Sequence, residues 1–379
     1  MSNAGKIVGL IVAAGYSRRM GRFKPLLPLG EKTVIENAVE SLRQGGIKDI
    51  RVVTGYRAEQ ISSALANVDV RIINNPKYAA GMFSSILAGI ESMESDIDGF
   101  LMLPGDNPLI RRRTVKAVLR EYRRTGATVV YPVFGGERGH PPFISSKSFA
   151  AIRRSNGDGG LRMILDGFAA AEAEVAVADQ GILMDLDTAE DYQKMTVYYE
   201  RHPIPTGDEC LAILDKYQGN ENVVRHGRAV AALGYSLAVL LKRAGLKMDP
   251  VLVSAAALLH DLAKGKKHHA RRGARMLKSI GFSCVADIIV THMDFAFRED
   301  GAIDEAAIVF LADKLVCGEQ RVTLWERFRP SMERFADQPE AVAAIVQRMQ
   351  SAIDIQHKIF RILGIRSFDE LHQRREGIL

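Results

Sequence analysis

Cysteine and long hydrophobic runs are both scarce in this chain of 379 residues. Only three cysteines occur, Cys210, Cys284 and Cys317, and their odd number and wide spacing exclude a disulfide framework or a cysteine-based zinc cluster. The apolar run nearest the start of the sequence is too short and too rich in glycine to cross a membrane, and no cleavable signal pattern accompanies it. These absences favour a protein of the reducing cytoplasm with no membrane partner.

What the chain does contain is a globular composition with a surplus of positive charge. Its 47% hydrophobic and 25% charged residues describe a folded protein whose length suits two domains. The formal net charge of +6 favours anionic ligands, for which nucleotides and phosphorylated small molecules suffice. Because no RNA-recognition pattern of basic and aromatic residues is present, nucleic acid is not an expected partner.

A loop rich in glycine and positive charge follows the first apolar segment. Residues 6–12 read as a strand buried on both faces, and Ala13-Ala14-Gly15 then lets the backbone approach a ligand closely. Arg18, Arg19 and Lys24 add three cations within a short stretch. The loop matches neither the P-loop nor the dinucleotide fingerprint, yet its amides and cations suit a nucleoside triphosphate.

Strand and helix patterns alternate through the first half of the chain. Strands are predicted at 6–12, 50–54, 70–74, 100–104 and 128–131, and helices near 33–44, 58–66, 84–93 and 114–124. Such alternation predicts an α/β fold with a doubly wound, mostly parallel sheet and helices on both faces. Ligands bind to such sheets at the carboxyl ends of the strands. The loop at 13–15 and the pair Gly105-Asp106 should therefore face one crevice.

The pattern becomes helical in the second half. Two prolines and a glycine in residues 201–207 predict a linker, and everything beyond it reads as helix. The helices are expected near 222–243, 250–262, 269–279, 304–316 and 339–363. We therefore predict a first domain over residues 1–200, a linker over 201–208 and an all-α domain over 209–379.

Carboxylates stand at two predicted strand ends in the first domain. Asp106 follows the apolar strand 100–103, and Asp185 and Asp187 lie together at a later strand end. A carboxylate beside a cationic glycine loop is placed to hold Mg²⁺ on triphosphate oxygens. The segment 75–85 joins a turn to a helix start, whose amides and hydroxyls can meet a base.

These segments, in this order, resemble the molybdenum cofactor nucleotidyltransferases over about residues 6–195. The resemblance is to the cytidylyltransferase branch more than to the guanylyltransferase branch, which usually has glycine where this chain has Ala14. The resemblance implies a Rossmann-like nucleotide-diphospho-transferase fold. The matching motifs are Ala13-Ala14-Gly15-Tyr16-Ser17-Arg18-Arg19-Met20-Gly21 with Lys24, Asn75-Pro76 with Gly81-Met82 and Ser85, Gly105-Asp106-Asn107-Pro108, Arg138-Gly139-His140-Pro141, Gly157-Asp158-Gly159-Gly160 with Arg162, and Asp185-Leu186-Asp187-Thr188.

The resemblance implies transfer of CMP from CTP to molybdopterin or its molybdenum form, which yields the cytosine dinucleotide cofactor and pyrophosphate. Lys24 and Arg19 are expected to hold the β- and γ-phosphates. Asp106, with Asp187 rather than Asp185, is expected to hold Mg²⁺. The remaining expected contacts are Ala13, Ala14, Gly15, Gly81 and Ser85 for the nucleotide and Arg138 and His140 for the pterin side. A molybdoenzyme or its chaperone is a further partner that this interpretation allows.

The helical half carries a second set of candidate ligands. Three separate predicted helices carry His226, the adjacent pair His260-Asp261, and Asp313. Two adjacent ligands on one helix can bind the same metal ion if residues of other helices supply the remaining ligands. This set resembles the HD superfamily of metal-dependent phosphohydrolases over roughly residues 222–316. The mixed nitrogen and oxygen donors suit Mn²⁺, Fe²⁺ or Mg²⁺.

The same resemblance suggests further roles around that cluster. Lys264 is expected, with Asp261, to orient water and phosphate. His292 is the preferred candidate for a second metal, ahead of His268 and His269, which sit in the basic run 264–272. That run is either a solvated segment or an electrostatic funnel for phosphate substrates.

Two alternatives remain open at this point. The chain can be a nucleotidyltransferase for another phosphorylated acceptor, with the HD domain as a non-catalytic nucleotide sensor. It can also act in RNA processing, since some tRNA-end nucleotidyltransferases carry HD domains. Those enzymes have another fold, and their Asp-x-Asp metal motif is matched here only by Asp185 and Asp187, at the wrong end of the domain.

Overall fold

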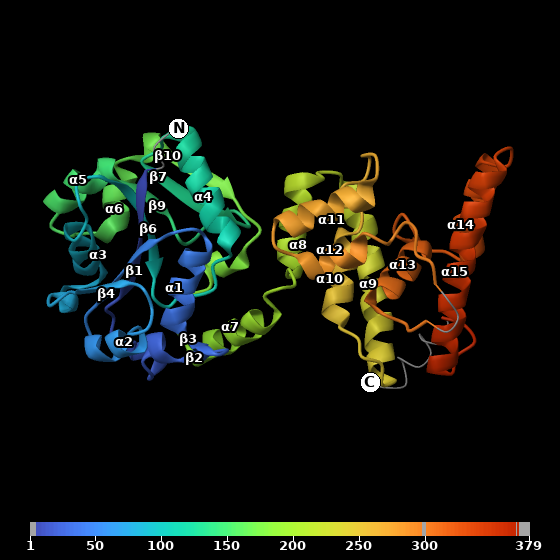
Figure 1. Ribbon diagram of the computed structural model, residues 1–379, viewed down its shortest axis with the longest axis horizontal. Helices are drawn as coiled ribbons and strands as arrows, with labels where there is room; N and C mark the ends of the chain where they lie inside the picture. Colours follow the sequence, from blue (N-terminus) through green and yellow to red (C-terminus); the bar gives the residue numbers. More distant parts are fainter. Residues whose placement is uncertain (1–4, 298–300, 369, 371–379) are drawn as a thin grey trace. The chain divides into compact units, whose positions relative to one another are not determined.

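The computed structural model describes residues 5–297, 301–368 and 370. The chain divides into two compact units, Met1–His202 and Pro203–Leu379 (Figure 1). The division falls inside the predicted linker, between helix α7, which ends at Arg201, and helix α8, which begins at Gly207. The domain boundaries given above remain a prediction.

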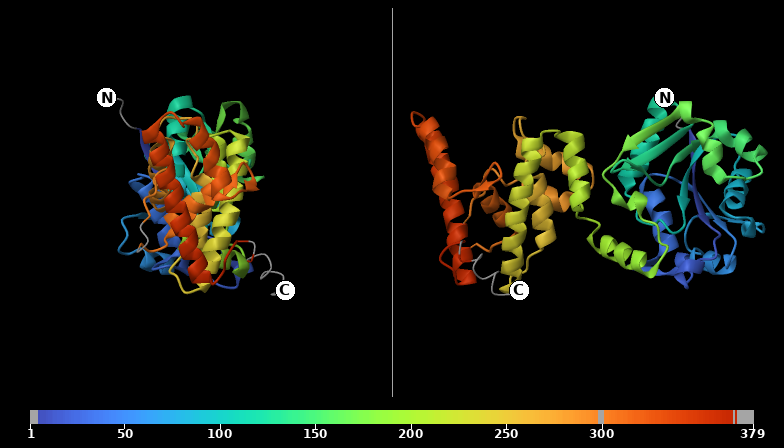
Figure 2. Two further views of the ribbon diagram at one scale, coloured as in Figure 1. Left: turned by 90° about the vertical axis from the view of Figure 1, so that its right-hand side faces the viewer. Right: turned by 180° about the vertical axis from the view of Figure 1, so that it is seen from behind.

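The first unit is built on a mostly parallel sheet of eight strands, in the order β10-β7-β9-β6-β1-β4-β5 with β8 beside β7. Only β9 and β8 run antiparallel to their partners. The prediction of a doubly wound, mostly parallel α/β fold is confirmed, and the twisted strands can be followed in the right-hand view of Figure 2. The strands are β1 (Lys6–Ala13), β4 (Asp49–Thr54), β5 (Arg71–Asn74), β6 (Ile97–Pro104), β7 (Val129–Phe134), β8 (Glu137–Arg138), β9 (Phe143–Ser145) and β10 (Glu172–Ala176).

Helices cover both faces of this sheet. In β1, a Cβ on Gly9 would meet Leu42 of α1, whereas Leu10 meets Gly89 of α3, so successive residues of the strand face different helices. The helices are α1 (Val34–Gln44), α2 (Ala58–Ala64), α3 (Met82–Glu91), α4 (Arg112–Thr125), α5 (Phe149–Arg154), α6 (Gly160–Asp166) and α7 (Ala189–Arg201), and β2 (Pro28–Leu29) pairs with β3 (Lys32–Thr33).

The pairing of β1 with β6 brings the two predicted halves of the site together. Val12 is in register with Pro104, and the amide of Gly105 donates to the carbonyl of Val12 at 2.9 Å. A Cβ on Gly105 would lie 2.8 Å from that of Ala13, so the close approach requires glycine. The loop after Ala13 and the loop after Pro104 are therefore neighbours at the carboxyl edge of the sheet.

The second unit is mainly helical, with one departure from the prediction. Residues beyond the linker were expected to be wholly helical, but β11 and β12 form an antiparallel pair, because Gly318 adopts a positive φ of 61° and reverses the chain. The elements are α8 (Gly207–Tyr217), α9 (Glu221–Arg243), α10 (Pro250–Leu259), α11 (His269–Ser279), α12 (Ser283–Ile289), α13 (Glu305–Lys314), β11 (Val316–Cys317), β12 (Gln320–Arg321), α14 (Leu324–Arg334) and α15 (Pro339–Leu363).

One helix end also differs from the prediction in a way that matters for function. The helix expected to run to Leu262 ends at Leu259, and a turn follows in which the amide of Lys264 donates to the carbonyl of Asp261 at 2.8 Å. The side-chain amide of Gln218 donates to the carbonyls of Asp261 and Leu262 at 3.1 and 3.2 Å. These bonds satisfy backbone carbonyls of the turn that follows the helix. Among the described residues, no helix is long and apolar enough to span a membrane.

Candidate functional sites

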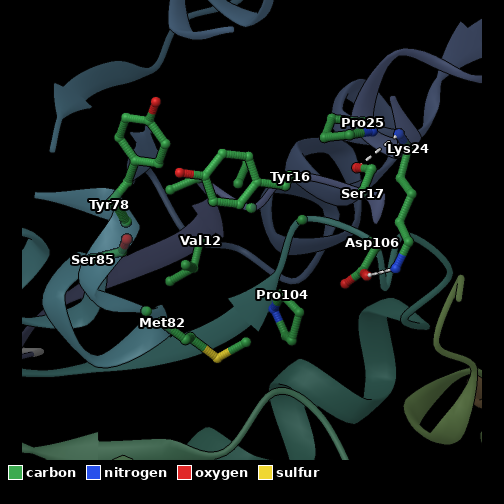
Figure 3. A pocket seen from close by; sticks show the side chains of 16 residues that line it. Val12, Tyr16, Ser17, Lys24, Pro25, Tyr78, Met82, Ser85, Pro104 and Asp106 are labelled. Atoms are coloured by element: carbon green, nitrogen blue, oxygen red, sulfur yellow. Dashed lines mark hydrogen bonds and ion pairs between the residues drawn. The ribbon is translucent and has the colours of Figure 1, made fainter. Parts of the chain in front are cut away.

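A cavity of about 330 Å³ opens at the carboxyl edge of the first unit's sheet. Figure 3 shows that its walls come from the loop after β1, the start of α3 and the end of β6. All five residues predicted to contact the nucleotide line it, together with Lys24 and Asp106. The lining residues are Val12, Ala13, Ala14, Gly15, Tyr16, Ser17, Lys24, Pro25, Tyr78, Ala79, Gly81, Met82, Ser85, Pro104, Gly105 and Asp106.

Lys24 joins two carboxylates at one end of this cavity. Its ammonium Nζ lies 3.0 Å from Oδ2 of Asp106 and 2.7 Å from Oδ1 of Asp187, and only 10% of its side chain is exposed. Burial lowers the pKa of Lys24, but its bonds to Asp187 and Asp106 outweigh burial and hold the pKa above its usual value. A cation thus fits between two carboxylates, and such an oxygen set also suits Mg²⁺.

The other charged groups of the loop differ in their contacts. Arg19 reaches Oδ2 of Asp187 at 2.8 Å from an exposed position. Arg18 instead lies over the ring of Tyr16, 4.6 Å from its centre. Asp185 accepts a hydrogen bond from Asn107 at 3.3 Å. The structure therefore brings Arg19 and Asp187 to the Lys24 cluster through side-chain bonds, and gives Asp185 a different partner.

The two residues predicted to meet the acceptor lie in different surroundings. The guanidinium of Arg138 bonds Glu174 at 2.6 Å and Glu172 at 2.9 Å, and it lies over the ring of Tyr131. Burial lowers the pKa of His140, against the charges of Asp185 and Asp106. The Nδ1 atom of His140 is buried and has no hydrogen-bond partner among the described residues. His140 therefore has a buried ring nitrogen without a hydrogen-bond partner among the described residues, whereas Arg138 already has intramolecular partners.

Three histidines of the second unit are held in the same way. The Nδ1 atoms of His226, His260 and His292 lie 2.9, 2.6 and 2.6 Å from the backbone carbonyls of Gly318, Ala257 and Ile289. A carbonyl only accepts, so each Nδ1 carries the hydrogen in that bond. Every ring consequently turns Nε2 away from that backbone carbonyl, which is how metal-binding histidines are oriented.

The Nε2 atoms converge on two carboxylates. His226 Nε2 lies 3.2 Å from Oδ1 of Asp313, and His260 Nε2 lies 3.4 Å from Asp261 and 3.5 Å from Asp313. The latter nitrogen is buried yet forms no hydrogen bond within the described structure. Burial lowers the pKa of His260, but the two carboxylates outweigh it and raise the pKa to about 10. The two carboxylates therefore favour a positive charge beside His260 Nε2, which a metal ion can supply in place of the proton.

A second group of ligand atoms shares Asp261. His269 Nε2 lies 3.3 Å from Oδ1 of Asp261 and 3.3 Å from His292 Nε2. The ligand atoms within each of two groups, His226-His260-Asp261 and Asp261-His269-His292, all lie within 4.8 Å of one another. The sequence ranked His269 below His292 because His269 sits in a basic run, although the helix predicted over 269–279 begins at His269, as α11 does. Its neighbour His268 precedes the helix with a positive φ of 54°.

Lys264 stands beside this cluster as predicted. Its ammonium bonds Oδ2 of Asp261 at 2.6 Å while half of the side chain remains exposed. Lys314, which the sequence did not single out, is buried and bonds Oδ2 of Asp313 at 2.6 Å and the carbonyl of His292 at 3.3 Å. Burial raises the pKa values of Asp261 and Asp313, but the surrounding positive groups hold both far below the usual range.

The two units of the chain match two different families. Residues 9–175 match the family described as MobA-like NTP transferase domain, and residues 223–316 match the HD domain. The chain is a nucleotidyltransferase, and its second half holds histidine and aspartate side chains whose ligand atoms lie within 4.8 Å of one another in each of two groups. Residues 9–175 form its MobA-like NTP transferase domain, and an HD domain follows at residues 223–316.

Individual relatives align with half of the chain or less. The molybdenum cofactor cytidylyltransferase of Escherichia coli (strain K12) is 29% identical over 185 residues, which are 48% of this chain and 92% of that protein. The nicotine blue oxidoreductase of Paenarthrobacter nicotinovorans is also 29% identical, over 50% of this chain and 96% of that protein. The uncharacterized protein MJ0778 of Methanocaldococcus jannaschii is 30% identical, over 37% and 92% respectively.

The Lys24 cluster generates a prediction about cation binding. In the Lys24→Met variant, Asp106 and Asp187 lose the ammonium that lies between them, so a divalent ion no longer competes with a bound cation. We expect the affinity for Mg²⁺ without nucleotide to rise by at least about tenfold, measured by calorimetry. Arg18→Met, which removes a cation of the same loop with no bond to either carboxylate, serves as the control and should leave it unchanged. Equal Mg²⁺ affinities in both variants and the wild type would contradict the prediction.

Proposed function

We propose that the first unit transfers CMP from CTP to molybdopterin or its molybdenum form and releases pyrophosphate. The observation that carries the proposal is the bridge formed by Lys24 between Asp106 and Asp187 beside the cavity. Phosphoryl-type transfer depends on positioning and on neutralising charge more than on covalent catalysis. A cavity with two carboxylates, a buried ammonium and a glycine loop supplies those requirements.

Each group of the cluster has a role in this reaction. Asp106 and Asp187 would hold Mg²⁺, which neutralises charge on the triphosphate when bound. Lys24 and Arg19 exchange their carboxylate partners for β- and γ-phosphate oxygens, and they stabilise the pyrophosphate that leaves. A Cβ on Gly15 would project into open space, with nothing within 4 Å of it. Because glycine lacks this Cβ, that space stays free and the phosphates can approach the backbone. The terminal phosphate of the acceptor then attacks the α-phosphorus in line.

The choice of base and acceptor rests on particular residues. Ala14 and Ser85 lie in the cavity wall beside Gly81, and the methyl group of Ala14 favours the smaller base, cytosine. On the acceptor side, the unpartnered Nδ1 of His140 is the better candidate, since Arg138 is bonded to Glu172 and Glu174. The relatives from Escherichia coli and Paenarthrobacter nicotinovorans, both 29% identical, bear names of different activities. The carboxylate and cation cluster, which suits triphosphate chemistry, supports nucleotidyl transfer.

We propose a phosphohydrolase activity for the HD unit. Its ligand set combines imidazole and carboxylate groups, which suits Mn²⁺, Fe²⁺ or Mg²⁺, and the shared Asp261 allows two ions to lie side by side. A bound metal lowers the pKa of its water so that it can attack a phosphate ester. Lys264, half exposed and bonded to Asp261, would hold a phosphate oxygen of the substrate.

A second candidate function keeps the transferase chemistry but changes its acceptor. Arg138 has carboxylate partners within the chain, which weakens the part of the pterin assignment that depended on it. In that case another phosphorylated molecule would accept the nucleotide, and the HD unit would bind a nucleotide without hydrolysing it. Metal-dependent hydrolysis of phosphate esters by the purified protein argues against this second candidate, and turnover with molybdopterin excludes it.

The carboxylates provide a matched test of the transferase. Asp187→Asn removes a proposed ligand of Mg²⁺ and should lower the turnover of CTP with molybdopterin by at least about a hundredfold. Asp185→Asn changes the same charge two residues away, where the carboxylate bonds Asn107, and should cost less than about tenfold. Product formation under saturating Mg²⁺ measures both, with circular dichroism as the check on folding. Equal losses in the two variants would refute the assignment of Asp187.

The metal content of the HD unit provides the next test. We expect two Mn²⁺ ions per chain after reconstitution and desalting, counted by inductively coupled plasma mass spectrometry. His269→Ala should lose one ion, because it removes a ligand from only one of the two groups. His268→Asn is the control, since asparagine tolerates the positive φ at that position, and it should retain both. Two retained ions in His269→Ala would show that the second group is not a metal site.

A further inference from the structure

Asn75 forms a complete set of hydrogen bonds beneath the wall of the nucleotide cavity. It is 3% exposed and follows β5, and its backbone amide donates to the carbonyl of Thr54 at 2.9 Å. Its side-chain Oδ1 accepts from the amide of Lys77 at 2.9 Å. Because that partner can only donate, the orientation of the side-chain amide is determined and its nitrogen must face the other way.

That nitrogen faces two serines at the start of α3. Nδ2 of Asn75 donates to Oγ of Ser84 at 2.9 Å and to Oγ of Ser85 at 3.0 Å. An amide has two hydrogens, so both are used. Each serine oxygen therefore accepts a hydrogen bond from Asn75. The remaining question is which acceptor the hydrogen of each serine hydroxyl meets.

The two hydroxyl hydrogens have different surroundings. Ser84 lies within donating distance of the carbonyls of Gly81 and Lys77, at 2.8 and 3.0 Å. Ser85 is 1% exposed and lines the cavity, and no acceptor for its hydrogen is found among the described residues. Figure 3 shows its hydroxyl on the cavity side of α3. A ligand in the cavity consequently meets Ser85 as a hydrogen-bond donor.

We infer that Asn75 is a positioning residue that selects the base by fixing the Ser85 hydroxyl as a donor to N3 of cytosine. This inference rests on the proposed cytidylyl transfer. N3 of cytosine accepts a hydrogen bond, whereas N3 of uracil and N1 of guanine each carry a hydrogen. A donor facing a donor leaves both groups unpaired in a buried site, which is a strong basis for rejecting a substrate.

Changing Asn75 to aspartate reverses the direction of the bond to Ser85. A carboxylate has no hydrogen to give, so it accepts the hydrogen of Ser85 and leaves lone pairs of that oxygen toward the cavity. The carboxylate still accepts from the amide of Lys77, so the turn after β5 keeps its bond. The site then presents an acceptor, which suits N3–H of uracil.

The test compares kcat/KM for CTP and UTP in wild type and variants. We expect the CTP-to-UTP ratio of Asn75→Asp to fall at least about tenfold below that of the wild type. Asn74→Asp is the matched control, because it adds the same charge at the neighbouring, exposed position of β5, and its ratio should stay within about twofold of the wild type.

A second pair of variants isolates the route through Ser85. Ser85→Ala and the double variant Asn75→Asp/Ser85→Ala should have the same CTP-to-UTP ratio, since without the hydroxyl Asn75 has nothing to orient. The inference is overturned if Asn75→Asp changes the CTP-to-UTP ratio equally in the wild type and in Ser85→Ala. It is also overturned if folded Asn75→Asp has the same ratio as the wild type. If Asn75→Asp does not fold, Asn75→Ala replaces it: a freely rotating hydroxyl both donates and accepts, so an unchanged ratio again overturns the inference. Failure of the wild-type protein to use CTP at all contradicts the proposed function instead.

Discussion

The ammonium group of Lys24 is the interaction on which the first unit's site depends. Lys24, Asp106 and Asp187 come from three segments far apart in the sequence, and without a cation between them the two carboxylates would repel each other. The sheet sets this geometry, because β1 and β6 are parallel neighbours that end together. A buried cation is costly unless it is paired, so the loop that carries Lys24 and the strand that leads to Asp106 stabilise each other's position.

In the HD unit, backbone carbonyls fix the positions of histidine side chains in the ligand cluster. Gly318, Ala257 and Ile289 each accept from the Nδ1 atom of one histidine, which fixes both the ring orientation and the tautomer. The hairpin β11–β12 therefore contributes to the ligand cluster through the carbonyl of Gly318, although it carries no ligand itself. Gln218 fixes the turn that follows α10 by donating its side-chain amide to the carbonyls of Asp261 and Leu262. In both units, polar groups outside the cluster determine which atoms face a ligand.

The sequence predicts what depends on local pattern, and it fails where partners are distant. The parallel sheet followed from apolar periodicity. Motif order and the resemblance to known families pointed to Lys24, Asp106 and the set His226, His260, Asp261 and Asp313. The ion pairs of Arg138 did not, because Glu172 and Glu174 lie on β10, a short strand with a weak pattern. The contact of His269 with Asp261 was missed for a different reason, because it depends on how α11, a helix that the sequence predicts, packs against the turn after α10. The roles proposed for all these residues remain predictions.

Pre-formed ion pairs also have a consequence for how ligands arrive. In the free protein, Lys24 keeps its charge and its position by bonding the same carboxylates that would hold a metal ion. A metal ion alone must displace that ammonium, whereas a metal ion accompanied by a triphosphate offers the ammonium new oxygen partners at a similar distance. The exchange replaces one set of ion pairs with another, and no charge is left buried without a partner. The arrangement thus favours a nucleotide that enters together with its metal over a metal that enters first.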